Sequence, residues 1–463
     1  MKRTAAVAFL LVFSLLLDAR HQAAAQFAAD AIKLPPVESA RLENGIRLFC
    51  IRDNLPQVTI VVSVGFGRLY EKKENAGISE LIAATISLGG SKNYPGEALH
   101  EKIDAMGGRL NVNSSWESTT ISIKVLDRFK DEAFAIAADL AAGPNLGPPY
   151  LDNAKALVAD SIRRKYDDPA EIAFSKVREI IFDGDGYGSF PTEEKIASYS
   201  PEQVRETWKK YCAGSGVMVG VSSSLDSAET NRLCRKYFSA ISAGGGPLYD
   251  ADIRKIRDRV KGNASKIFFY PKDIPQSTVI VGTVAPDIGY QGDYALEVMN
   301  YILGGGSFNS RLMTEIRVKR GLAYAVQSIV KFRFKTGLFL AFAQVENKTV
   351  GEALGLMYKN IDMISHEAIS SKEIEWAQRS IANSFIFQFD TPMNILSNYM
   401  FIAYNNLPKD YFNSYIAHVN SVTGMDILAE ARAVLDYGLV TVVVGNESVL
   451  SDLKKHGEIV ILK

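Results

Sequence analysis

The sequence predicts an α+β fold in which one type of domain, a β-sheet with helices packed on it, occurs twice. Three observations support this prediction. Strands and helices are mixed in both halves of the chain, the two halves repeat the same order of elements, and a Gly- and Pro-rich segment separates them. The chain has 463 residues, of which 47% are hydrophobic and 22% are charged. This composition is typical of a globular protein and argues against a disordered, collagen-like or coiled-coil chain.

Each half contains a β-branched strand followed by an amphipathic helix that ends at glycines. In the first half the strand is 58–64 (VTIVVSV), and the apolar residues of the next helix recur at helical spacing until Gly89 and Gly90. In the second half the strand is 277–284 (STVIVGTV), and the helix after it ends at 304–306 (GGG). The same pair of elements therefore occurs twice, which predicts a duplicated domain.

Both halves also end on a β-branched segment that follows a helical stretch. These segments are 216–221 (GVMVGV) and 440–445 (VTVVVG). The stretch between the halves begins with Gly and Pro and continues with many charged residues, as is typical of a linker. We therefore expect an N-terminal domain at 38–245, a linker at 246–261 and a C-terminal domain at 262–463.

The first 25 residues have the order of a secretory signal peptide. Two basic residues at 2–3 precede an apolar run at 5–17, and small residues follow it up to Ala25. The run is shorter than the roughly 20 residues that a membrane span needs. We expect cleavage near Ala25 and Gln26 and export to the periplasm or the extracellular space; an uncleaved membrane anchor is the alternative.

Charge and cysteine content limit the possible partners. Lys+Arg and Asp+Glu both total 52, so the chain has no net formal charge. Proteins that bind nucleic acids usually carry a basic excess, so we expect no nucleic-acid partner. No stretch after the signal peptide is long and apolar enough to predict a membrane span. The cysteines Cys50, Cys212 and Cys234 lack the spacing of a disulfide framework or a zinc knuckle. We expect buried free thiols, although one pair could close in an oxidising compartment.

Five segments carry more specific patterns: 42–47 (LENGIR), 77–90 (GISELIAATISLGG), 107–115 (GGRLNVNSS), 154–169 (AKALVADSIRRKYDDP) and 304–324 (GGGSFNSRLMTEIRVKRGLAY). In this order they resemble the pitrilysin/insulinase metallopeptidases, especially the branch similar to mitochondrial processing peptidase. The resemblance covers nearly the whole chain after the signal peptide. It implies two homologous domains, each a mainly antiparallel sheet packed with helices, which together form half of a clamshell that admits unfolded peptides.

The resemblance also implies where an active member would bind zinc, and this chain differs there. In active members, the helix that corresponds to 77–90 of this chain carries His-x-x-Glu-His. Its two histidines lie on one face and hold Zn²⁺, and the Glu is the general base. A Glu on the later helix is the third ligand. Alanine cannot bind a metal, and one carboxylate falls short of three protein ligands, so we expect no zinc in this chain. The degenerate positions are Glu80 and Ala84 for the histidines, Ala83 for the base and Ser161 for the third ligand.

The second half keeps a pair of residues that the family uses in catalysis. By the resemblance, Arg317 and Tyr324 correspond to an Arg that holds the substrate backbone and a Tyr that hydrogen-bonds the scissile carbonyl or its oxyanion. A phenol donor aimed at a developing oxyanion stabilises the transition state, and a guanidinium is a rigid, permanently charged donor. The alternative is an inherited surface pair without a role.

The segment 107–115 resembles the family's edge strand on the substrate side. In the family this strand pairs with an extended peptide, which is a strand-addition mode of binding. An ordinary edge strand is the alternative. The substrate-binding residues expected here are Gly108, Asn111, Val112 and Asn113.

These expectations combine into two hypotheses of different class. In the first, the chain is the non-zinc subunit of an exported metallopeptidase and is inactive alone. A zinc-bearing subunit of the same family is then its heterodimer partner, zinc is bound only by that partner, and Arg317 and Tyr324 act on unfolded peptides in trans. In the second, the chain is a catalytically inert binding or scaffold protein of the same fold, and the pair is a relic.

Overall fold

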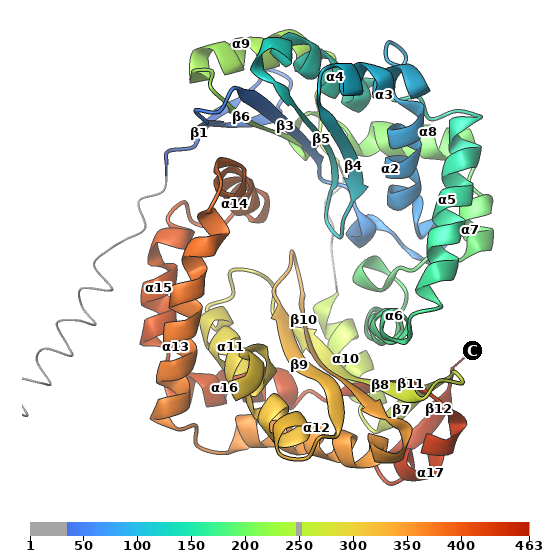
Figure 1. Cartoon of the computed structure of the whole chain (residues 1–463), viewed down its shortest axis with the longest axis vertical. Coiled ribbons are helices and arrows are strands. Elements are labelled where there is room, and N and C mark those ends of the chain that lie inside the picture. The colour runs from blue at the N-terminus through green and yellow to red at the C-terminus, as the bar shows by residue number, and fades with distance from the viewer. Residues whose placement is uncertain (1–34, 247–251, 463) are drawn as a thin grey trace, which may run out of the picture.

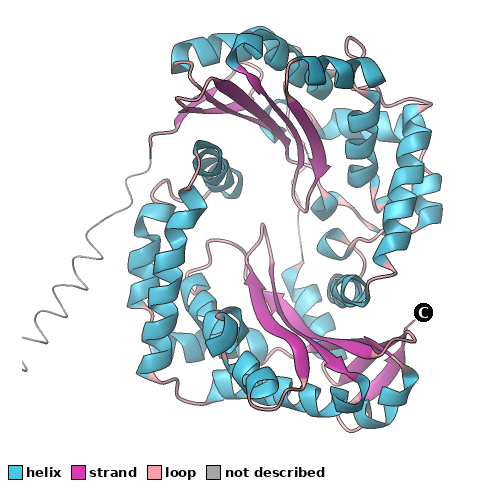
Figure 2. Ribbon diagram, viewed as in Figure 1, coloured by secondary structure: helices cyan, strands magenta, loops and turns pink. Residues whose placement is uncertain are grey.

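The computed structural model describes residues 35–246 and 252–462, so the predicted signal peptide lies outside the described residues. The described residues form two six-stranded sheets, one in each half of the chain, with most helices on their outer sides (Figures 1 and 2). The inner faces of the sheets point toward the middle of the molecule. The predicted α+β fold with a helix-packed sheet in each half is confirmed.

The first sheet has the strand order β1-β2-β6-β3-β5-β4. The neighbouring strands pair in antiparallel orientation except β2 and β6, which are parallel. The strand β4 is therefore a free edge, because it pairs with β5 alone. The bounds are β1 Glu38–Arg41, β2 Arg47–Arg52, β3 Gln57–Val64, β4 Arg109–Ser114, β5 Thr119–Leu126 and β6 Val217–Ser223.

The second sheet has the order β12-β7-β11-β8-β10-β9, which repeats the first sheet in its five strands from β7 to β9. The strand β7 pairs in parallel with β11 and β12, and the other pairs are antiparallel. The sixth strand of each sheet departs from the repeat. In the second sheet it is β12, the last strand of the chain, whereas in the first sheet it is β1, the first strand of the chain. The bounds are β7 Lys266–Pro271, β8 Gln276–Ala285, β9 Ala323–Lys331, β10 Gly337–Glu346, β11 Val440–Gly445 and β12 Glu458–Ile461.

Helices surround each sheet. Those of the first half are α2 Ile78–Gly89, α3 Gly96–Ala105, α4 Lys130–Ala142, α5 Tyr150–Lys165, α7 Glu193–Ala197, α8 Pro201–Tyr211 and α9 Ser227–Phe238. Those of the second half are α11 Asp293–Asn300, α12 Val350–His366, α13 Ser371–Phe385, α15 Tyr411–Ser421, α16 Gly424–Leu435 and α17 Leu450–Leu453. The predicted helix stops are correct: α2 ends at Gly89, and α11 continues through a π-helical turn, Tyr301–Gly305.

Two helices cross to the opposite half. Helix α6 (Pro169–Phe182) comes from the first half but packs on β8 and β11, whereas α14 (Pro392–Asn405) comes from the second half but packs on β2 and β6 (Figure 1). Val177 of α6 shares a buried apolar cluster with Ile280 of the second sheet, and Met400 of α14 shares another with Met218 of the first. The halves therefore cannot separate without exposing apolar surface.

The segment predicted as a linker, 246–261, is helical in its second part. Helix α10 (Ile253–Asn263) begins within it, and its buried Ile256 and Val260 join the cluster that contains Val177. These two apolar residues lie four positions apart among charged ones, which gives the helix one buried face. Residues 253–261 are thus part of the folded body rather than a flexible connection.

Two further expectations from the sequence concern the state of the cysteines and the presence of membrane-spanning segments. Cys50, Cys212 and Cys234 are buried free thiols, as expected. Burial raises the pKa of Cys212 to about 12, which disfavours the reactive thiolate. Within the described residues, no helix combines the length and the apolar character that crossing a membrane requires.

Gly220 on β6 allows α14 to lie close to the first sheet. A Cβ atom at this position would lie 2.6 Å from Sδ of Met400 and 3.2 Å from Cδ2 of Leu396, both on α14. Packing in protein interiors is too dense to absorb such an approach without movement. A side chain at position 220 would therefore have to displace the ends of the Met400 and Leu396 side chains.

We expect Gly220→Val to lower the free energy of unfolding by roughly 1–3 kcal/mol, the usual cost of overpacking a core. Urea unfolding measures it. Gly262→Val on α10 is the control, since a Cβ there meets nothing within 4 Å. Equal effects of the two substitutions would contradict this account of the α14 contact.

Candidate functional site

Helix α2 carries the positions of the lost zinc motif, and a buried carboxylate fixes its start. Glu71 accepts hydrogen bonds from the backbone N–H groups of Gly77 (2.8 Å) and Ser79 (2.9 Å) and from the hydroxyls of Ser79 (2.6 Å) and Ser189 (3.2 Å). An acidic group is favourable at a helix N-terminus. Burial raises the pKa of Glu71, and the hydrogen bonds act in the opposite direction. Glu71 therefore fixes the start of the helix.

Glu80, at the first histidine position, lies between two cations. One carboxylate oxygen lies 3.5 Å from Nη2 of Arg68, and the other lies 3.8 Å from Nζ of Lys165, at the end of α5. The other degenerate positions lie on the same two helices, which pack together: Ala83 is buried, and Ala84 and Ser161 are partly buried. In the part of the chain that the structure describes, no three His, Cys, Asp or Glu residues are grouped as a metal site.

The edge strand β4 lies beside α2, and its side chains alternate. Arg109, Asn111 and Asn113 are exposed, whereas Leu110 and Val112 pack against the core of the first half. The two asparagines predicted to bind substrate are thus accessible, but Val112 can offer only its backbone. A Cβ at Gly108 would lie 2.7 Å from Cγ1 of Val125, so this glycine lets the chain enter the strand close to β5.

Arg317 and Tyr324 lie together at the other free edge, β9. Tyr324 is 72% exposed near the start of this strand, and Arg317 lies on the preceding π-helical turn, Met313–Val318. The guanidinium carbon of Arg317 lies 5.8 Å from the ring centroid of Tyr324 and 5.8 Å from that of Phe308. Arg317 is therefore held by two aromatic rings at the surface.

The charge of Arg317 is not matched by a neighbouring acid. The nearest acid in sequence, Glu315, pairs with Lys319 and Arg320 instead. Across residues 35–246 and 252–462, none of the ion pairs involves Arg317. A guanidinium with an accessible phenol beside it can donate to a carbonyl or an oxyanion.

Phe308 is not marked by any motif in the sequence, and its side chain is 66% exposed. It follows Ser307, whose φ of 53° lies in the left-handed region that few residues other than glycine adopt. Its place in a glycine-rich turn was the available signal, because large apolar side chains are uncommon in such turns. The pattern gave no sign that its ring would contact Arg317.

The edge strands β4 and β9, two of the four edge strands of the described sheets, lie apart in the structure. In Figure 1, β4 is at the right end of the upper sheet beside α2, whereas β9 is at the left end of the lower sheet. The corresponding strands of the two sheets therefore run in opposite order across the view. In this view β9, the strand on which Tyr324 lies, is on the other sheet from the one beside α2.

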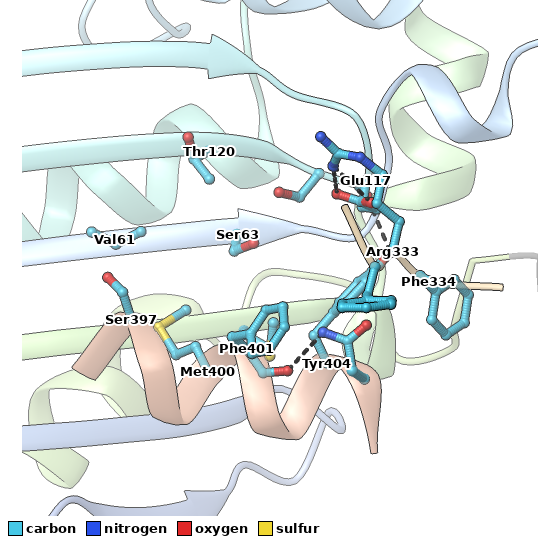
Figure 3. A pocket seen from close by; sticks show the side chains of 14 residues that line it. Val61, Ser63, Glu117, Thr120, Arg333, Phe334, Ser397, Met400, Phe401 and Tyr404 are labelled. Carbon is cyan, nitrogen blue, oxygen red and sulfur yellow. Dashed lines mark hydrogen bonds and ion pairs between the residues drawn. The ribbon is translucent and has the colours of Figure 1, made fainter. Parts of the chain in front are cut away.

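A polar junction and a cavity of about 310 Å³ lie between the halves (Figure 3). Nη1 of Arg333, in the loop between β9 and β10, lies 3.2 Å from Oε1 of Glu117 in the β4–β5 turn. The Tyr187 hydroxyl lies 2.8 Å from the same carboxylate oxygen and 2.9 Å from the carbonyl oxygen of Phe334. Burial, followed by the charge of Glu117, raises the pKa of Tyr187. Side chains of α14, among them Met400 and Tyr404, form the other wall.

Two family models match the chain. "Insulinase (Peptidase family M16)" matches residues 48–190, and "Peptidase M16 inactive domain" matches residues 198–381. The first match lies in the first half, the second runs from the end of the first half into the second, and together they extend over most of the described residues.

Curated relatives are similar over most of their length. The "Uncharacterized zinc protease YmxG" of Bacillus subtilis is 24% identical over 77% of this chain and 85% of its own. The "Non-peptidase homolog YmxG" of Helicobacter pylori is 21% identical over 81% of this chain and 85% of its own. "Cytochrome b-c1 complex subunit 1, mitochondrial" of Bos taurus is 21% identical over 86% of this chain and 84% of its own. The relatives that are similar to this chain in sequence thus include one named as a zinc protease and others with different names.

Solved structures show the same fold. A peptidase M16 inactive domain from Pseudomonas fluorescens has a TM-score of 0.78 at 18% identity, covering 89% of this chain and 98% of that one. A protease from Helicobacter pylori also has a TM-score of 0.78, at 16% identity, covering 89% of this chain and all of that one.

For the junction at Glu117, we expect Arg333→Met to lower the free energy of unfolding by roughly 1–2 kcal/mol, because a mostly buried carboxylate loses its cation. Both side chains keep some exposure, 28% and 21%, so solvent screens part of the effect. Lys348→Met is the control, as Lys348 pairs with Glu346 in a largely exposed position. If urea unfolding showed the same loss of stability in the Arg333 and Lys348 variants, a structural role for the junction would be contradicted.

Proposed function

Because this chain belongs to the insulinase family of peptidases, family M16, and lacks its His-x-x-Glu-His motif, we propose that it is the non-zinc subunit of an exported zinc peptidase. A second subunit of the same family carries the zinc. This chain lends Arg317 and Tyr324 to the partner's site and half of the chamber for unfolded peptides. The observation that carries the proposal is the exposed Arg317–Tyr324 pair at a free sheet edge.

The chemistry of the pair supports a catalytic role in trans. If a partner's zinc activated water for attack on a peptide carbonyl, negative charge would develop on the carbonyl oxygen, and the phenol of Tyr324 could stabilise it as a fixed donor. A guanidinium can hold a backbone carbonyl of the same peptide. Arg317 and Tyr324 offer these two donors next to each other, and no described acid competes for the guanidinium.

The surface around the pair supports a partner that covers it. Phe308, Val318 and Tyr324 are all more than 60% exposed, and Arg317 contacts two of them. Apolar side chains gathered at a surface are typical of interaction sites. The separation of β9 from α2 within the chain also favours a site completed by another subunit.

The cellular setting of the proposal rests on the sequence alone. The signal-peptide pattern of residues 1–25 supports export to the periplasm or the extracellular space.

Substrate peptides would bind in extended form along β4, where Asn111 and Asn113 are exposed beside an unpaired strand edge.

A catalytically inert scaffold is the second candidate. The observation that favours it is the loss of every zinc-motif position, with Glu80 now held by Arg68 and Lys165. The names of two relatives, a non-peptidase homolog and a subunit of a respiratory complex, agree with such a role. In this case Arg317 and Tyr324 would be relics.

For the proposed subunit, we expect Arg317→Ala and Tyr324→Phe each to reduce peptide cleavage by the purified complex about 100-fold, the size of a lost oxyanion donor. Cleavage of a quenched, unstructured peptide with and without chelator measures activity, and size-exclusion chromatography checks that the complex is intact.

Arg257→Ala and Tyr437→Phe are matched controls, because these residues form another surface Arg–Tyr pair, with the guanidinium carbon 4.6 Å from the ring centroid. Full activity in both Arg317 and Tyr324 variants, with assembly preserved, would refute the catalytic role and favour the scaffold.

A further inference from the structure

A small cavity of about 20 Å³ lies at the junction of the two halves, and the proposed function makes no use of it. From the first half, Trp116 of the β4–β5 turn and Arg178 of α6 line it. From the second half, Lys331 at the end of β9 and Arg333 in the loop after it line it as well. Among the described residues at this cavity, three are basic and none is acidic.

Arg178 is a mostly buried cation without an acidic partner. Its guanidinium carbon lies 5.1 Å from the ring centroid of Trp116 and 5.6 Å from that of Phe174. Among described residues its side chain makes one hydrogen bond, from Nη1 to the carbonyl oxygen of Phe174 at 3.2 Å, and no ion pair. Buried charges are normally paired, because a lone charge away from water is costly. Arg178 therefore lacks a counter-ion.

The remaining nitrogens of Arg178 are accessible to a ligand. The buried side-chain nitrogen and oxygen atoms that lack a hydrogen bond in the described part of the chain include none of Arg178. Its Nε and Nη2 atoms make no hydrogen bond, so they are open to solvent. A guanidinium has N–H donors and no acceptor, and its strongest hydrogen bonds are made to anions.

The other charges at the cavity leave a positive excess. Nη1 of Arg333 lies 3.2 Å from Oε1 of Glu117, so these two charges compensate each other. Lys331 forms no ion pair within residues 35–246 and 252–462. Arg178 and Lys331 are therefore two cations at the cavity that no described acid matches.

The neighbours of Arg178 disfavour its charge. Burial lowers the pKa of Arg178 to about 10, the charges of Arg333 and Arg68 add to this effect, and Glu171 opposes it. Arg178 is still charged at neutral pH, so it remains a cation that other cations repel. An anion placed among them would relieve this repulsion.

The size of the cavity limits which anion it can hold. A cavity needs roughly 10–15 Å³ to hold one water molecule. With a volume of about 20 Å³, this cavity accommodates a single ion that is little larger than water. Chloride meets this limit, whereas tetrahedral oxyanions such as sulfate and phosphate exceed it.

We propose that this cavity binds a chloride-sized inorganic anion, with the guanidinium of Arg178 and the ammonium of Lys331 as its cationic partners. Arg178 belongs to the first half and Lys331 to the second, so the anion links segments of both halves. A ligand that binds only the folded chain stabilises it, so the stability of the protein depends on chloride. The proposal uses neither Arg317 nor Tyr324 and needs no second subunit, so it can hold or fail independently of the proposed function.

Thermal unfolding of the purified protein in mixtures of sodium chloride and sodium gluconate tests the proposal. Chloride replaces gluconate stepwise at constant ionic strength, so that the screening of surface charges stays the same. We expect the melting temperature to rise and then level off, by about 2 °C when chloride is about tenfold above its dissociation constant. A melting temperature that does not depend on chloride, or one that rises without levelling off, would overturn the proposal.

Arg178→Met should abolish the dependence of the melting temperature on chloride, because the site loses its buried cation. Arg128→Met is the matched control. Arg128 is an exposed arginine whose guanidinium carbon lies 4.8 Å from the ring centroid of Phe129, and it does not line the cavity. This control variant should keep the full dependence on chloride. Each variant is compared with itself in chloride and in gluconate, so a general loss of stability does not affect the result.

Circular dichroism checks that each variant is folded, and Lys331→Gln replaces Arg178→Met if the latter does not fold. Lys331 is exposed, so its loss should leave the fold intact. With Lys331→Gln the protein should need a higher chloride concentration for half of the rise, because one of the two unmatched cations is gone. A dependence on chloride that is unchanged in the Arg178 or Lys331 variant, or one that Arg128→Met also removes, would contradict the assignment of the site.

Discussion

The exchange of α6 and α14 between the halves is the contact on which the rest of the structure depends. Each helix completes the apolar core beneath the sheet of the other half, so the two sheets take one relative placement. Gly220 allows α14 to approach, and the ion pair of Glu117 with Arg333 adds a polar contact at the same junction. Strands β4 and β9 occupy corresponding edge positions of the two sheets, and in Figure 1 they lie on opposite sides of the view. Edge strands can accept a further strand, so β4 and β9 are candidate binding surfaces.

The two halves have treated the inherited site differently. In the first half, Glu71 holds the start of α2, and Arg68 and Lys165 pair with Glu80. In the second half, Arg317 and Tyr324 remain exposed. Exposed aromatic and cationic side chains add little to stability, so the fold itself gives no reason to place them together. Binding to another molecule would give a reason to place them together. This difference between the two halves is the basis of the proposed function.

The sequence was sufficient for local structure and for the family, but not for contacts between distant segments. Periodic apolar residues and glycines predicted the central strands and the ends of α2 and α11, because these features act within one element. The same periodicity in α6 and α14 shows that each has an apolar face, but not which sheet that face covers. The contacts of Arg68 with Glu80 and with the Trp116 ring likewise join separate segments, so no local pattern predicts them. Helix α10 was read as a linker because its many charges concealed the two apolar residues that bury it.

The most direct test of the central claim is affinity purification of the tagged wild-type protein from its own cells, followed by metal analysis and a peptide cleavage assay. The account predicts that a second chain of the same family co-purifies, that zinc is present in proportion to that chain, and that chelator abolishes cleavage. Purification of the protein alone, or with a partner that contains no zinc and cleaves nothing, would contradict it.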